Sequence, residues 1–168
     1  DMIGTMVQGA TVPQALDVPV ALAGGMGTGR QLMACLSLGA DGMVLATRMI
    51  VSEEVWAHQN YKKHLSELGA GDTRLIMNIF GDSSRVLSNK SSARVLELEA
   101  EGITDYEAYR PHVQGILQKE AYVDGDWNKG TASIGQSVAF AGDIEPVETI
   151  IDGIIAEAAA VRDRLNSI

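Results

Sequence analysis

Four glycines follow directly on an apolar run in the segment VPVALAGGMGTGRQL, residues 18–32. The apolar run 18–23 is typical of a strand buried on both faces. Glycine after such a strand lets backbone N–H groups approach a ligand closely, and the first N–H groups of a following helix favour an anion. Gly24, Gly25, Gly27 and Gly29 therefore predict an anion site, and phosphate is the usual occupant of such a turn.

Two fold contexts place a phosphate at a turn of this kind: the dinucleotide-binding fold and the last strands of a TIM barrel. No register of the four glycines matches the dinucleotide fingerprint G-x-G-x-x-G, and no Gly-Lys-Ser/Thr loop is present in the sequence. A second apolar run, residues 42–48, ends in Ala46, Thr47 and Arg48 instead of the acidic residue of the dinucleotide fold. The hydroxyl and the cation at this strand end suit a second contact to the phosphate.

The remaining residues with chemical potential favour ordinary structural roles. His58 and His64 are spaced so that a helix would place them on different faces, which argues against a shared metal. The loop at Asp124 and Asp126 lacks the glycine and the glutamate that a calcium loop needs at its sixth and twelfth positions. Cys35 lies on an apolar helical face, which favours a buried thiol. The sequence thus predicts no metal site and identifies no catalytic residue.

The elements that must position the glycines form one βαβ unit. Strands are expected at 18–23 and 42–48, with a helix at 30–38 that ends at Gly39, so the two strands should be parallel. A helix is expected from Ser52, as its N-cap, to about Leu68, with Glu53 and Glu54 at its positive end. Further along, the patterns predict a strand at 73–80, helices at 91–102 and 105–122, and a last helix that opens at Glu145-Pro146.

Composition limits the possible functions. The 168 residues suffice for one domain with a core, and 46% are apolar, which is typical of a globular chain. The net charge of −9 argues against nucleic acid as a partner. No apolar stretch is long enough to span a membrane. Cys35 is the single cysteine, so no internal disulfide can form, and a reducing, cytoplasmic location is expected.

The segment PVALAGGMGTGRQLMACLSLGADGMVLATRMI resembles the flavin-binding part of the nitronate monooxygenase family, also called 2-nitropropane dioxygenases, and that of the related FMN-dependent enoyl-acyl carrier protein reductases. Further matches follow in the family's order and extend the resemblance over nearly the whole chain. They comprise Glu53-Glu54, residues 57–62 (AHQNYK), Asp72-Thr73, residues 85–90 (RVLSNK), Gly125-Asp126 and Gly135-Gln136.

The resemblance implies an α/β fold, namely the C-terminal part of a TIM (β/α)8 barrel with its last two βα units, followed by a small, mainly helical added domain. The implied boundaries are 1–68 for the barrel units, 69–140 for the added domain and 141–168 for a C-terminal helix that packs back on the barrel. The implied cofactor is FMN, bound without a metal. The residues expected to bind it are Gly24, Gly25, Met26, Ala46, Thr47, Gly135 and Gln136.

The activity implied by the resemblance is oxidation of a nitronate or nitroalkane with O2. The family's catalytic histidine lies upstream of the segment that resembles residues 1–16, so this chain would form the C-terminal half of the enzyme. Expected partners are the small-molecule substrate, O2, a chain that supplies the N-terminal half of the barrel, and a second copy of this chain. Two alternatives stay open: an enoyl-acyl carrier protein reductase that uses NAD(P)H, and a non-catalytic FMN-binding fragment or subunit.

Overall fold

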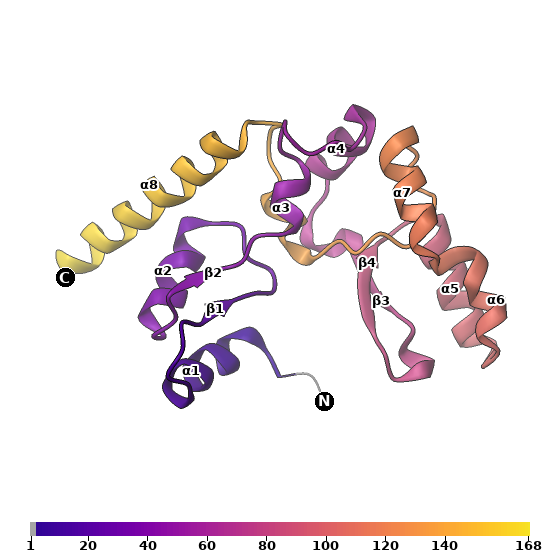
Figure 1. Cartoon of the computed structure of the whole chain (residues 1–168), viewed down its shortest axis with the longest axis horizontal. Helices are drawn as coiled ribbons and strands as arrows, with labels where there is room; N and C mark the ends of the chain where they lie inside the picture. Colours follow the sequence, from indigo (N-terminus) through magenta and orange to yellow (C-terminus); the bar gives the residue numbers. More distant parts are fainter. Residues whose placement is uncertain (1–2) are drawn as a thin grey trace.

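The computed structural model, which describes residues 3–168, is a helix-rich α/β chain with two short parallel strands and a helix between them in its N-terminal part. Helix α1 (Thr5–Ala15) leads into β1 (Ala21–Leu22), which is followed by α2 (Gly29–Ser37) and β2 (Gly42–Met43). The strands pair in parallel, with Ala21 opposite Gly42 and Leu22 opposite Met43. The predicted parallel pair and its helix are therefore present (Figure 1).

Both strands are shorter than the sequence predicts. The expected strand 42–48 is wrong at its end, because Thr47 begins a short helix, α3 (Thr47–Ile50). Ala46 precedes that helix with φ −126° and ψ −77°, outside the extended region. Within residues 3–168, β1 and β2 pair only with each other. Neither strand has a second neighbouring strand whose hydrogen bonds would lengthen it.

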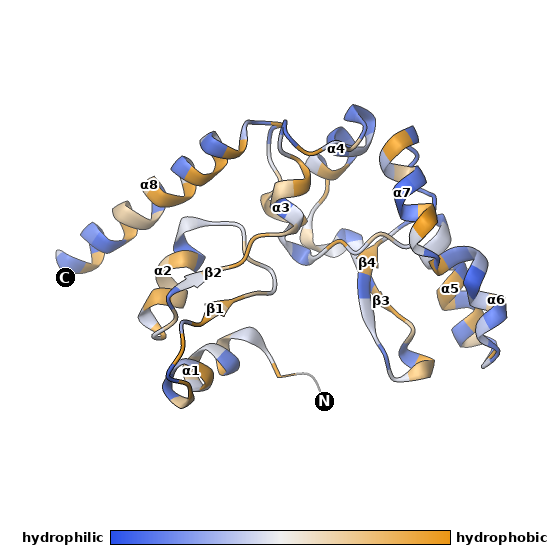
Figure 2. Ribbon diagram, in the orientation of Figure 1, coloured by the Kyte–Doolittle hydropathy of each residue, from blue (hydrophilic) through white to orange (hydrophobic). Residues whose placement is uncertain are grey.

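Helix α2 agrees closely with its sequence signals. Thr28 caps it, and the side chains of Thr28 and Gln31 form a reciprocal capping box. Gly39, with φ +93°, follows the helix end as predicted. Helix α2 packs mainly against the C-terminal helix α8 (Val147–Asn166). Figure 2 shows that α8 alternates apolar and polar residues along its length, as a helix with one covered face requires.

The helix predicted with Ser52 as its N-cap begins six residues later than expected, because its observed N-cap is His58. Helix α4 spans Gln59–Ser66 and is capped by His58, whose Nδ1 accepts a hydrogen bond from Asn60 N at 3.1 Å. Ser52 is fully buried and pairs with Glu145 in an isolated parallel bridge, so it does not cap α4. This bridge joins the segment after α3 to the segment that leads into α8.

An antiparallel hairpin and three helices form the opposite side of the molecule (Figure 1). Strand β3 (Thr73–Ile76) pairs with β4 (Ser84–Leu87), which the sequence analysis did not predict. The predicted strand 73–80 ends early because Met77 adopts φ +64°, and a 3-10 helix, η2 (Asn78–Phe80), follows. Two further 3-10 helices are η1 (Ala70–Asp72) and η3 (Gln136–Phe140).

The helices behind the hairpin are α5 (Lys90–Ala100), α6 (Tyr106–Val113) and α7 (Gly115–Asp124). The single helix predicted at 105–122 is thus two helices, and the break lies at Gln114, where ψ is 133°, while Pro111 lies inside α6. Buried side chains form three clusters: one beside β1 and α2, one between the hairpin and α5–α6, and one around α4, α7 and η3. None of the helices within residues 3–168 has the length and apolar character needed to cross a bilayer.

Candidate functional site

The turn after β1 exposes backbone N–H groups because two glycines adopt conformations that other residues disfavour. Gly24 has φ +104° and Gly25 has φ +74°. A Cβ on Gly24 would lie 2.9 Å from Thr5 Oγ1, whereas a Cβ on Gly25 would meet no atom within 4 Å. Among residues 3–168, the N–H groups of Gly24 and Gly25 have no hydrogen-bond acceptor. The turn therefore offers adjacent donors beside open space.

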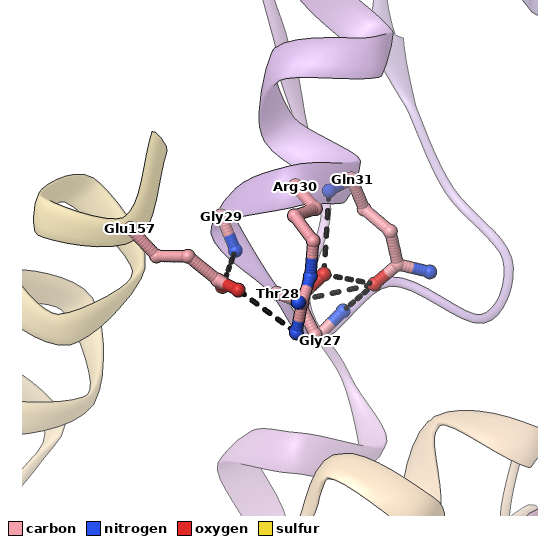
Figure 3. Close-up of polar contacts among 6 residues, drawn as sticks. All are labelled: Gly27, Thr28, Gly29, Arg30, Gln31 and Glu157. Carbon is pink, nitrogen blue, oxygen red and sulfur yellow. Dashed lines mark hydrogen bonds and ion pairs between the residues drawn. The ribbon is translucent and has the colours of Figure 1, made fainter. Parts of the chain in front are cut away.

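The N-terminus of α2 is already occupied by groups of the chain itself (Figure 3). Gly29 N donates to Glu157 Oε2 of α8 at 2.6 Å, and Gln31 N donates to Thr28 Oγ1 at 3.2 Å. Gln31 Oε1 accepts hydrogen bonds from Gly27 N at 2.8 Å and from Thr28 N at 3.1 Å. The expectation that the start of α2 receives a phosphate is therefore corrected: the anion there is the carboxylate of Glu157.

Gly27 and Gly29 serve close packing. A Cβ on Gly27 would lie 2.7 Å from the ring of Phe140, and a Cβ on Gly29 would lie 2.3 Å from the backbone oxygen of Ile154 in α8. Real Cβ atoms do not come this close to backbone, so α2 and α8 can cross at this distance only because residue 29 has no side chain. The four glycines thus have two tasks, and only Gly24 and Gly25 form the exposed turn.

Thr47 connects the end of β2 to the loop at Gly135. Its hydroxyl accepts a hydrogen bond from Gly135 N at 2.9 Å, although the two residues are far apart in sequence, and Thr47 is 4% exposed. The N–H groups of Ala46 and Thr47 have no acceptor within residues 3–168. The contact fixes the position of Gly135 and Gln136, at the start of η3, relative to the strand end.

Arg48 does not extend toward a ligand. Its side chain is 8% exposed, and its Nη2 atom lies 3.0 Å from Glu145 Oε2. The suggestion that this cation makes a second phosphate contact is therefore corrected. The guanidinium instead ties α3 to the segment that leads into α8, next to the bridge between Ser52 and Glu145.

A cavity of about 510 Å³ brings four of the predicted site residues together. Gly24 and Gly25 line it from the turn after β1, and Gly135 and Gln136 line it from the start of η3. The other residues of the wall have no role predicted from the sequence. They are Ile3, Gly4, Thr5, Leu75, Ser83 and Arg85. Arg85 stands in the segment RVLSNK, so the family resemblance marked its position without indicating what its side chain does.

Met26, Ala46 and Thr47 do not line this cavity. The side chain of Met26 is buried in the cluster beside α2, with its sulfur 4.0 Å from Cys35 Sγ. It fills a gap in the core, so only its backbone can contribute to the turn. Ala46 is exposed at the end of β2, whereas the Thr47 side chain points to Gly135.

The histidines and carboxylates that were considered in the sequence have structural partners. Burial lowers the pKa of His64, which stacks on Trp127 with ring centroids 4.2 Å apart. Asp126 accepts a hydrogen bond from Asn128 N at 3.0 Å and Asp124 pairs with Lys129, as in a turn. Within residues 3–168, no group of three or more His, Cys, Asp or Glu side chains is placed to hold a metal ion.

Glu54 and Cys35 also have structural roles. Glu54 accepts hydrogen bonds from Val147 N at 2.9 and 3.0 Å, so its carboxylate lies at the positive end of α8 rather than of a helix that contains it. Burial raises the pKa of the Cys35 thiol, which opposes formation of a reactive thiolate. These contacts place none of the candidate acids and bases beside the cavity.

Most of the chain matches the model of one protein family. The nitronate monooxygenase family model matches residues 2–157. A probable nitronate monooxygenase from Staphylococcus saprophyticus is 36% identical over 134 residues, which cover 78% of this chain and 35% of that protein. A (3aS,4S,5R,7aS)-5-hydroxy-7a-methyl-1-oxo-octahydro-1H-indene-4-carboxyl-CoA dehydrogenase from Rhodococcus jostii is 26% identical over an alignment of 193 positions, which covers 94% of this chain and 55% of that protein.

Solved structures resemble the chain over nearly its full length. FabK from Thermotoga maritima superimposes with a TM-score of 0.89 at 28% identity, covering 99% of this chain and 52% of that one. Nitroalkane oxidase from Streptomyces ansochromogenes gives 0.75 at 29% identity, covering 97% and 46%. The chain thus spans about half, or less, of the length of most of the relatives it matches.

Proposed function

Because the chain belongs to the nitronate monooxygenase family, we propose that it forms the phosphate-binding half of an FMN-dependent oxidoreductase that oxidises a nitronate or nitroalkane with O2. In this proposal β1 and β2 are the last two strands of a TIM barrel. The observation that carries it is the cavity in which the Gly24–Gly25 turn meets Gly135 and Gln136. These residues come from distant parts of the sequence, and the family resemblance assigns both pairs to the flavin.

The chain's donors fit a phosphate at this turn. Gly24 and Gly25 offer N–H groups without acceptors among residues 3–168, and the space beside Gly25 is open. Ala46 and Thr47 offer further N–H groups at the neighbouring strand end, where parallel strands bring their carboxyl ends to one edge. We assign the phosphate to these four residues and, through its backbone, Met26. Gly135 and Gln136, held by Thr47, would then lie toward the ring.

The bound flavin would accept electrons from a carbanion-like substrate and pass them on to O2. The residues of this chain hold the phosphate, orient Gly135 and Gln136, and keep that loop fixed. No described residue at the cavity is suited to abstract a proton, because its lining includes no histidine and no carboxylate. We therefore assign the catalytic base to the N-terminal half of the enzyme.

The proposal assigns three parts to the chain: barrel units at 1–68, an added domain at 69–140, and a C-terminal helix at 141–168. The bridge between Ser52 and Glu145 supports the return of the chain to the barrel units before the last helix, because it joins the segment after α3 to the segment that leads into α8. The added domain at 69–140 then lies within an insertion between a barrel strand and its helix. Contacts between α8 and α2 fit two neighbouring helices on the outside of a barrel.

The test is FMN binding to the chain, measured by titration of flavin fluorescence. We expect a 1:1 complex, and Gly25→Ala should weaken it about tenfold, because an alanine at φ +74° is strained by about 1–2 kcal/mol and the turn would relax away from the phosphate. Gly142→Ala is the matched control, since Gly142 has open space and no positive φ. Failure of the unmodified chain to bind FMN would contradict the proposal.

An enoyl-acyl carrier protein reductase is the second candidate. The sequence supports it, because the segment PVALAGGMGTGRQLMACLSLGADGMVLATRMI resembles the flavin-binding part of both enzyme families. Oxygen uptake with a nitronate would favour the monooxygenase, whereas NADPH oxidation with an enoyl thioester would favour the reductase. FMN binding without turnover of either substrate, in the enzyme assembled from both halves, would indicate a non-catalytic subunit.

A further inference from the structure

One charged side chain, Arg85, lines the cavity among the residues that the structure describes. Arg85 lies on β4 directly opposite Leu75 of β3, and Leu75 lines the same cavity. Side chains alternate between the two faces of a hairpin, so Arg85 and Leu75 share one face while Arg74 and Val86 share the other. Val86 is buried against α5 and α6, which confirms that the second face points away from the cavity.

The guanidinium of Arg85 keeps most of its hydrogen-bonding capacity. Its Nη1 atom donates to Thr73 Oγ1 at 3.1 Å, and within residues 3–168 it forms no ion pair with a carboxylate. A guanidinium has five N–H donors in a planar fork. In a partly buried position beside a cavity, such a fork favours a planar oxyanion that can accept two parallel hydrogen bonds. The chain carries a net charge of −9, so the attraction of an anion to this cavity depends on the local positive charge of Arg85.

We propose that Arg85 binds the oxyanion of the substrate from the hairpin side of the cavity. This inference rests on the proposed function, which assigns the phosphate of FMN to the turn at Gly24 and Gly25. Figure 1 shows β3 and β4 on the opposite side of the chain from β1 and that turn, and the cavity connects the two. Arg85 lines the cavity from β4, whereas Gly24 and Gly25 line it from the turn after β1, so the guanidinium is placed to select a substrate with a planar anionic group, a nitronate or a carboxylate.

The hairpin positions this charge through several contacts. Thr73 is buried and holds one nitrogen of the guanidinium. Leu87, directly opposite Thr73, is fully buried in the cluster around α4 and η3. The hydrogen bond to Thr73 therefore restricts the arginine side chain before an anion binds, which lowers the side-chain entropy lost on binding.

The test uses nitrate, a stable planar oxyanion with the shape of a nitronate, and follows the Arg85 Nε–H signal by NMR in the full chain with and without FMN. We expect nitrate to shift this signal. Arg85→Gln should raise the dissociation constant of nitrate at this site about tenfold, and Arg85→Lys should raise it less, because a lysine retains the charge without the fork. Nitrate binding to the variants is followed through the amide signals of Ser83 and Leu75.

Arg74→Gln is the matched control, because Arg74 lies on the same hairpin with its side chain on the opposite face and its Nε bonded to Ser88 Oγ. It should leave nitrate binding unchanged. FMN affinity should also be unchanged in Arg85→Gln. A fall in FMN affinity without an effect on nitrate would overturn the inference, since the guanidinium would then serve the flavin phosphate.

Absence of any nitrate-dependent shift at Arg85 in a chain that binds FMN would likewise overturn the role of Arg85 while leaving the proposed function intact. A shift at Arg85 in a chain that never binds FMN would overturn the proposed function and support the anion site. The two proposals therefore fail separately.

Discussion

At the scale of single residues, Glu157 changes the interpretation of the glycine-rich turn. Its carboxylate accepts the N–H of Gly29 at 2.6 Å and pairs with Arg30 at 3.0 Å, so the positive end of α2 is neutralised from within the chain. A phosphate bound at the neighbouring turn would therefore interact with the N–H groups of Gly24 and Gly25 rather than with the α2 dipole. The internal anion site at Gly29 and the proposed phosphate site at Gly24 and Gly25 thus lie only a few residues apart.

Glu157→Ala should destabilise the chain by about 1 kcal/mol, because the N–H of Gly29 loses its acceptor at a helix N-terminus. The ion pair with Arg30 adds little to this value, since the Arg30 side chain is largely exposed. Urea unfolding measures the change. Asp152→Asn, an exposed position on the same helix, is the control and should have no effect. FMN affinity should not fall in Glu157→Ala, and a large loss would mean that the phosphate uses the start of α2 after all.

At the scale of the elements, the contact between α2 and α8 depends on Gly29. In Gly29→Ala the new Cβ would lie 2.3 Å from the Ile154 carbonyl oxygen, and neither helix backbone can yield locally. The two helices must move apart, which should destabilise the chain by about 1–3 kcal/mol. Thermal or urea unfolding would show the loss.

Gly153→Ala, on helix α8, is the matched control, and its expected change in the free energy of unfolding has the opposite sign. Gly153 lies inside α8 with no atom within 4 Å of a built Cβ, so an alanine there should stabilise the helix by up to about 1 kcal/mol. A Gly29→Ala variant as stable as the unmodified chain would show that α2 and α8 do not pack as closely as described.

Elements with local signals could be predicted from the sequence, and those determined by distant partners could not. Thr28, Gln31 and Gly39 encode both ends of α2 within a few residues, and the structure has that helix where expected. Ser52 looked like an N-cap, but its partner Glu145 lies in a distant part of the chain and draws it into a buried bridge. The strand predicted at 73–80 ends early because Met77 adopts a left-handed backbone conformation. A methionine rarely does so, and therefore its position could not be recognised from the sequence.

The candidate site shows the same division. The turn at Gly24 and Gly25 follows from the local pattern of glycines directly after an apolar run, and the family resemblance singled out Gly135 and Gln136. The roles of Arg85, Thr5 and Leu75 depend on how the hairpin and α1 meet that turn, which no local pattern encodes. The hydroxyl of Thr47 was expected to face a ligand, and its contact to Gly135 became visible only in three dimensions.

At the scale of the whole molecule, one face of the β1–β2 pair is uncovered. Side chains that alternate with the buried ones along these segments are exposed, and they include Ala21, Ala23, Val44 and Ala46. Leu22, on the other face, is buried against α2. On α1, Met6 and Val7 are also exposed. In the proposed barrel this face would be covered by the N-terminal strands, and in the isolated chain it is an apolar surface with open strand edges.

We therefore expect the isolated chain to self-associate, with a sedimentation coefficient that rises with protein concentration. Val44→Lys should reduce this association, because it places a charge at the centre of the apolar face and gives an edge strand the residue that natural edges use against pairing. Ile155→Lys is the control: Ile155 is equally apolar and exposed, but it lies on α8 away from the strands, so association should persist. If the chain stays monomeric at every concentration, or if both lysine variants behave alike, then the strand face is not the surface that requires a covering partner.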